Sequence, residues 1–365
     1  MVVITMPPFA TSALLVTAIL LGATAPVLPA LAQSSKAPTA APAPAPLAPP
    51  MKIPDYRGSL RDLVTGLSDY AKGRNARFIV LTREGLGLTV KEEREVKMEA
   101  LLNPNPDPRI PVATTPLGSP HRRYVKAIDG VVMNDQYCVP VVDSTASVGF
   151  IRMLQDNGLS VLSVDHCETR QMVGTALAES RKNGVLAHVD MSPRGLDRVP
   201  ADPPVGENSN NINGLGEARN VLFLDGNAGY TTKDDLVVAL GQTNWDMVVM
   251  DAFHRDRTPL TYADVKSLHQ KKVGTRRLIL ARLDIAHARD TRYYWKNDWK
   301  VGSPDWIASP VVAVPGEYDV KFWDAEWRAL VGKTFAALMD LGFDGVVLEG
   351  VDAYKPLEAR IPLNL

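Results

Sequence analysis

Acidic side chains and histidines follow most of the short apolar runs in this sequence. Val346, Val347 and Leu348 lead into Glu349, and Asp352 comes three residues later. Other apolar runs end in or beside Arg83, Glu84, Asn134, Asp135, Asp165, His166, His188, Asp190, Asp225, Asp251, Asp284 and His287. Glycoside hydrolysis needs two carboxyl groups across a cleft, because one protonates the leaving oxygen while the other attacks or activates water. The pattern therefore predicts an acidic site at the ends of strands.

Several other roles remain open for these residues. Any single Asp can cap the following helix or pair with Arg or Lys, and Asp225 before Gly226 and Asn227 is typical of a turn. A Ser-His-Asp hydrolase is not favoured, because the sequence has no G-x-S-x-G elbow. A metal-dependent enzyme is a further alternative, with ligands drawn from Asp165, His166, His188, Asp251 and Asp284. The His residues lack the i, i+4 spacing of helical zinc ligands, and no Cys/His spacing fits a zinc site, so we expect neither a metal nor a cofactor.

The apolar runs alternate with helical patterns, as in a (β/α)8 TIM barrel. Continuous β-branched runs are typical of strands buried on both faces. The expected strands are residues 78–82, 127–133, 159–165, 185–189, 220–224, 245–251, 277–284 and 343–349. A helix at 59–74 precedes the first strand and could take the place of the missing last helix. An open doubly wound sheet is the alternative, but no Gly-rich phosphate loop follows a strand.

An aromatic-rich insertion follows the seventh strand. Five of the six tryptophans fall within residues 293–327. Aromatic rings stack on the apolar faces of sugars, so this segment could form a saccharide platform, with Tyr293 and Trp295 as the best ligand candidates. It could also pack a small core of its own, and we expect both.

The first fifty residues predict export. Residues 1–32 resemble a signal peptide that ends in Ala30-Leu31-Ala32, although a permanent membrane anchor is the alternative. Residues 33–50, rich in Ala and Pro, predict an extended linker, and residues 51–365 form the folded domain. Cys138 and Cys167 could form one disulfide or remain separate thiols. We expect a periplasmic or extracellular protein.

Composition limits the partners. Hydrophobic residues make up 45% of the chain, which is typical of a globular protein, and the net charge is -1. A charge so close to zero does not favour nucleic acid or a membrane surface as partner. We expect a monomer that binds a polysaccharide and has neither nucleic acid nor, after signal cleavage, a membrane as partner.

Six segments occur in this order along the chain: residues 218–224, 245–251, 277–281, 290–295, 318–324 and 342–354. Together they resemble glycoside hydrolase family 114, the endo-α-1,4-polygalactosaminidase-like TIM barrels, some of which once carried a cysteinyl-tRNA synthetase-related label. The resemblance covers most of residues 51–356 and implies hydrolysis of a galactosamine-type polysaccharide. The order of the segments along the chain differs from that of the family. Here the segments at 59–84, 124–137 and 159–167 precede the strand at 343–349, whereas in the family they follow it. A closed barrel tolerates such a permutation.

The acidic positions depart from the family as well. Glu349 stands where the resemblance implies Asp, Asn134 lies near the second implied carboxylate, and Ala286-His287 replaces a Gly-Glu pair. The leading hypothesis is an exported glycoside hydrolase with Glu349 as the primary catalytic carboxylate and Asp251 or Asp135 as its partner. The expected substrate-binding residues are Asn134, Asp165, His166, Asp284, His287, Tyr293, Trp295 and Asp352. The rival hypothesis is a barrel that binds glycan without cutting it, because an amide cannot act as a general acid.

Overall fold

The computed structural model describes residues 53–102, 115–138, 147–191 and 196–363. The expected signal peptide and linker lie outside these residues. In the described part, an eight-stranded parallel sheet runs in the order β4-β3-β2-β1-β13-β9-β6-β5 and curves into a nearly closed barrel. Its strands are β1 (Ile79–Arg83), β2 (Gly130–Asn134), β3 (Ser160–His166), β4 (Leu186–Asp190), β5 (Val221–Phe223), β6 (Met247–Met250), β9 (Leu278–Asp284) and β13 (Gly345–Glu349). The predicted barrel fold is confirmed.

Side chains on each strand alternate between two hydrophobic cores. In β1, Leu81 belongs to the inner core of the barrel, whereas Val80 belongs to the outer core between sheet and helices. In β13, Val347 lies inside and Val346 outside. Because partners in a parallel register point to the same side, the pairing of Leu81 with Val347 keeps the inner layer continuous across strands. The strands are therefore apolar on both faces, as their sequences predict.

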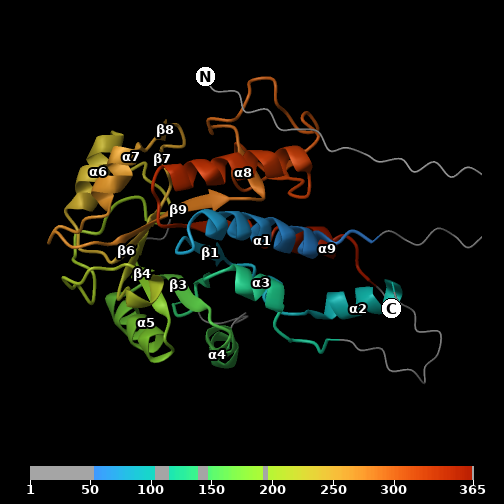
Figure 1. The fold of residues 1–365 in the computed structure, drawn as a ribbon, viewed down its shortest axis with the longest axis horizontal. Coiled ribbons are helices and arrows are strands. Elements are labelled where there is room, and N and C mark those ends of the chain that lie inside the picture. The colour runs from blue at the N-terminus through green and yellow to red at the C-terminus, as the bar shows by residue number, and fades with distance from the viewer. Residues whose placement is uncertain (1–52, 103–114, 139–146, 192–195, 364–365) are drawn as a thin grey trace, which may run out of the picture. The chain divides into compact units, whose positions relative to one another are not determined.

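Helices cover the outer face of the sheet. Figure 1 shows α1 (Tyr56–Arg74) and α8 (Ala325–Asp340) side by side, where Arg328 donates to the carbonyl oxygen of Ser59 at 2.7 Å. Asp55 caps α1, and Asp324 caps α8. The other helices are α2 (Glu93–Leu102), α3 (Arg122–Ala127), α4 (Val148–Asp156), α5 (Arg170–Lys182), α6 (Lys233–Gly241), α7 (Tyr262–Leu268) and α9 (Tyr354–Ala359), with short 3-10 turns η1 (Leu86–Leu88) and η2 (Leu215–Glu217). Helix α1 precedes β1, as expected.

The barrel has one seam, between β4 and β5. These strands occupy the two ends of the hydrogen-bonded order. The described residues between them contain the turn η2 but no α-helix. The ring of His188 on β4 lies 3.1 Å from the carbonyl oxygen of Val221 on β5, so a side chain joins the two edges.

The aromatic insertion forms a small antiparallel sheet of β10 (His287–Arg289), β12 (Glu317–Val320) and β11 (Ile307–Pro310). Trp306 packs edge-on against Trp299 and at a tilt against Trp327 of α8. Trp295 stacks on Tyr318 with ring centroids 4.9 Å apart. Most of these aromatic rings therefore pack on one another. A separate hairpin joins β7 (Phe253–His254) to β8 (Thr258–Pro259).

Cys138, just after β2, and Cys167, just after β3, form a disulfide. Their Cα atoms lie 4.9 Å apart, and both residues are buried. The pairing that the sequence left open is thus present. Within the described residues, no helix combines the length and apolar character needed to cross a membrane.

Lys271 and Asp246 form an ion pair whose side chains are fully buried, with 2.5 Å between Nζ and Oδ1. Replacing Lys271 with Met leaves the Asp246 carboxylate buried without its cation. We expect Lys271→Met to lower the free energy of unfolding by about 3–5 kcal/mol, measured by urea denaturation.

Lys182→Met is the matched control, because its pair with Glu179 is exposed and should be worth less than about 1 kcal/mol. Equal losses for the two variants would contradict the assigned role of the buried pair.

Candidate active site at the barrel mouth

The inward-facing row of each strand continues past the apolar core into charged residues. Leu278 and Leu280 belong to the inner core, and the same alternation brings Arg282 and Asp284 to the inside. Val347 leads in the same way to Glu349. The inward positions at the carboxyl ends of the other strands are Arg83, Asn134, His166, Asp190, Asp225 and Asp251. The period-two pattern thus gathers charges at the barrel mouth, where parallel barrels place their sites.

Glu349 lies between two arginines. Arg282 forms a bidentate ion pair with Glu349, with Nε 2.9 Å from Oε1 and Nη2 3.0 Å from Oε2. Nη1 of Arg83 lies 3.2 Å from the same Oε1. All three side chains are largely buried. The carboxylate is therefore held in one orientation by charge-assisted hydrogen bonds.

Asp225 shares an arginine with Glu349. Its Oδ1 lies 2.6 Å from Nη1 of Arg83, the nitrogen that also contacts Glu349. Two oxygens that share one nitrogen in this way lie no more than about 6 Å apart, near the separation typical of retaining glycosidases. Burial raises the pKa of Asp225, but the hydrogen bond and charge of Arg83 outweigh it, so the net pKa is lowered.

Asp251 follows β6 and pairs with Arg292 from the insertion. The pair is bidentate, with Nη1 2.9 Å from Oδ1 and Nη2 2.5 Å from Oδ2. The guanidinium of Arg292 also lies over the ring of Phe253, 5.7 Å from its centroid. This pair ties the insertion to the strand ends.

Asp284 and His287 form a second titratable unit at the end of β9. Nδ1 of His287 lies 2.9 Å from Oδ2 of Asp284, and the backbone N–H groups of Ala286 and His287 donate to Oδ1. Burial lowers the pKa of His287, but the hydrogen bond and charge of Asp284 more than compensate and raise it to about 9. His287 is therefore protonated at neutral pH.

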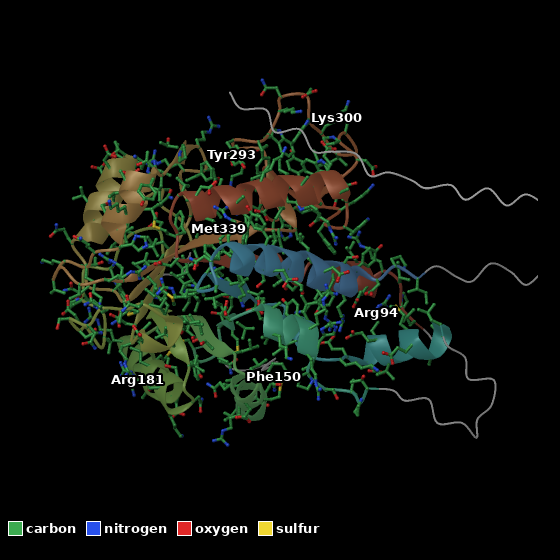
Figure 2. All side chains as sticks on the ribbon, viewed as in Figure 1. Arg94, Phe150, Arg181, Tyr293, Lys300 and Met339 are labelled. Carbon is green, nitrogen blue, oxygen red and sulfur yellow. A yellow bond between two sulfur atoms is a disulfide. The ribbon has the colours of Figure 1, made fainter. Side chains whose placement is uncertain are left out.

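One cavity of about 220 Å³ connects these groups. Its polar end is formed by Asp225, Arg282, Asp284, His287 and Glu349. Its apolar end is formed by Ala252, Phe253, Trp327, Leu330, Val331 and Leu338, four of which lie on α8. Tyr293, labelled in Figure 2, lies beside α8 and also lines the cavity. The volume is below the roughly 300–1,000 Å³ of drug-sized ligand sites, which favours one sugar unit.

The cavity lining is less acidic than the strand ends alone suggest. Its five carboxylates are Asp225, Asp251, Asp256, Asp284 and Glu349, and its cations are Arg255, Arg282, Arg289, Arg292 and protonated His287. The pattern of strand ends in the sequence predicts most of these acids but not the four arginines of the lining. The two sets balance, so the cavity is close to neutral.

Some predicted residues lie outside the cavity lining. Asp165 is fully buried on the outward row of β3 and accepts from the backbone N–H of Tyr137 at 2.5 Å, and burial raises its pKa. Asp135 follows β2 with a left-handed backbone, φ 49°. Asp352 is half-exposed near Lys355. These positions do not follow the inward alternation. Their proposed roles stay predictions.

Asn134, His166 and Trp295 have identified contacts of their own. Asn134 accepts from Nε of Arg83 at 2.9 Å, so it touches the same arginine as Glu349. His166 lies 2.7 Å from Asp190 on the neighbouring strand β4. Trp295 packs on Tyr318, away from the cavity lining.

Asp225 was predicted as a turn residue, and Arg282 and Arg292 were not among the predicted site residues. Counting alternate positions from the apolar core of β5 and β9 reaches Asp225 and Arg282 directly. Arg292 lies on no strand, so no periodic signal leads to it. Among the described residues, no group of three or more His, Cys, Asp or Glu is arranged to hold a metal ion.

No family model matches this chain. An uncharacterised protein of Deinococcus radiodurans is 34% identical over 122 residues, which is 33% of this chain and 38% of that protein. An uncharacterised protein of Methanocaldococcus jannaschii is 27% identical over 40% of this chain and 42% of its own length. An uncharacterised protein of Thermotoga maritima is 36% identical over 21% of this chain and 24% of its own length. The chain thus spans less than half of each relative. The carboxyl transferase domain of Rhizobium etli pyruvate carboxylase aligns with a TM-score of 0.26 and 9% identity, over 83% of this chain and 45% of that one.

The raised pKa of His287 predicts that the free energy of unfolding depends on pH. The folded-state pKa of about 9 exceeds the reference value of 6.5. The stabilisation that the His287–Asp284 pair contributes is therefore fully present below about pH 6.5 and is lost as pH rises through 9. Asp284→Asn should move the pKa of His287 down toward its reference value, as measured by NMR titration of the ring. An unchanged pKa would contradict Asp284 as the cause. Asp234→Asn, at an exposed position of α6, is the control.

Proposed function

We propose that this protein is a glycoside hydrolase acting on an amino-sugar polysaccharide, as the resemblance to glycoside hydrolase family 114 implies. The observation that carries the proposal is the grouping of Glu349, Asp225 and protonated His287 around one cavity at the mouth of a barrel. A cavity large enough for a sugar unit adjoins the pair.

Glu349 is suited to act on the anomeric carbon. Two arginines orient its carboxylate, as a nucleophile requires. In the first step its carboxylate bonds to the anomeric carbon while the glycosidic C–O bond breaks. Asp225 stabilises the positive charge that develops on the sugar. In the second step water replaces Glu349 at the anomeric carbon.

His287 is the proposed proton donor. It carries a proton at neutral pH and lines the same cavity. Its partner Asp284 is the register neighbour of Glu349 on the adjacent strand, which brings the acid close to the nucleophile. His287 gives its proton to the leaving oxygen and takes one back from the attacking water. This role replaces the acid that the resemblance implies near Asn134.

Export is part of the proposal. The disulfide between Cys138 and Cys167 supports it, because such bonds persist in oxidising compartments and are rare in the cytosol. The predicted signal peptide also supports export.

A second candidate is a barrel that binds glycan without cutting it. One observation favours it: both carboxylate oxygens of Glu349 are already engaged by arginines. Such engagement lowers nucleophilicity unless substrate binding rearranges the pair.

Reducing-end release from galactosaminogalactan tests the catalytic role of Glu349. We expect Glu349→Gln to reduce release by about a hundredfold or more, because the amide cannot form the glycosyl intermediate. Glu93→Gln, at an exposed position of α2, is the matched control and should retain activity. Binding without release by the wild type would favour the second candidate.

The pH profile tests His287. We expect kcat/KM to fall as pH rises through about 9, because the proton donor is then lost. His287→Gln should abolish this alkaline limb along with most of the activity. An alkaline limb that persists in the residual activity of this variant would assign the acid to another group.

A further inference from the structure

The cavity reaches beyond the charged strand ends into the outer layer of the barrel. Glu349 and Arg282 occupy the inward row of the sheet. Trp327, Val331 and Leu338 belong instead to the outer hydrophobic core, between sheet and helices. The cavity thus leads from a polar end, where a sugar ring can react, to an apolar end beneath α8.

Tyr293 covers this space from the insertion. Its ring stacks on Phe253, with centroids 5.2 Å apart and planes 10° apart. Its hydroxyl lies 2.6 Å from Oγ1 of Thr334 on α8. Because Thr334 already donates to the carbonyl oxygen of Leu330, Tyr293 is the donor of this bond. The two hydroxyls are polar groups beside the apolar end that a ligand amide could contact.

A free ammonium group is poorly matched to this cavity. The lining carboxylates already have cations: Asp225 pairs with Arg83, Asp251 and Asp256 with Arg292, Asp284 with His287, and Glu349 with Arg282. At the apolar end, an ammonium would lose its hydration without gaining a partner. A neutral apolar substituent would gain from the same burial.

We propose that the site recognises N-acylated amino sugars, with the acyl group in the apolar end, rather than sugars that carry a free amine. This inference rests on the proposed function, because it assumes that a sugar ring occupies the polar end. It narrows the substrate class of that function and assigns Val331 and Leu330 to substrate specificity.

Calorimetric binding of methyl glycosides of galactosamine and of its N-acetyl, N-propionyl and N-butyryl derivatives tests the proposal. We expect the N-acetyl glycoside to bind more tightly than the free amine. Affinity should rise further, by up to about fourfold per added methylene, until the apolar end is filled. Equal or tighter binding of the free amine, or no binding of the N-acetyl glycoside, would overturn the proposal.

Val331→Phe fills the apolar end and should abolish the increase in affinity with acyl length. Val238→Phe is the matched control, because Val238 is 64% exposed on α6; it should leave the increase unchanged. If Val331→Phe fails to fold, Leu330→Phe tests the same space from a half-buried position. A persistent increase in the folded variant would overturn the proposal.

The two proposals can fail separately. Acyl-dependent binding without hydrolysis would retain the acyl site and reject the hydrolase. Hydrolysis of deacetylated polymer with no acyl preference in binding would retain the hydrolase and reject the acyl site.

Discussion

The ion pairs inside the barrel mouth are the constraint on which the rest of the site depends. Arg282 projects inward from β9 into a largely buried position, and an unpaired charge there would be costly. Glu349 on the neighbouring strand compensates it with a bidentate pair, and Arg83 from β1 links Glu349 to Asp225. Three strands and the loop after β5 are thereby held together. The same contacts that satisfy buried charge also orient the proposed nucleophile, so stability and function are coupled here.

The insertion after β9 completes the site from outside the barrel. Its tryptophans pack mainly on one another and on α8, which makes the segment a rigid support. From that support Arg292 reaches Asp251, and Tyr293 reaches Thr334. The saccharide-platform interpretation and the mini-core interpretation of the aromatic segment are therefore compatible, because packed rings position a few exposed groups. Tyr293 is the member that lines the cavity, whereas Trp295 packs on Tyr318.

Much of the architecture could be predicted from the sequence because its signals are local. Eight apolar runs, separated by helical patterns and ending in or within two residues of Asp or Glu, sufficed for the barrel and for Glu349. The choice among acids was harder. Asp165 and Glu349 both end apolar runs, yet Asp165 lies on the outward row and accepts a backbone N–H, whereas Glu349 points into the mouth. Strict counting of alternate positions separates them. Arg292 lies on an irregular segment and had no such signal.

The sequence by itself determined the parallel barrel, its helix before the first strand, and the position of Glu349 at the mouth, because hydrophobic periodicity and strand ends are encoded in consecutive residues. Only the tertiary structure decided which charges meet. The pairing of Arg83 with both Asp225 and Glu349 joins residues more than a hundred positions apart. It follows from barrel curvature and strand register, which no local pattern carries. The tertiary structure likewise creates the cavity beneath α8, because the cavity exists only where the sheet, the insertion and the helix come together.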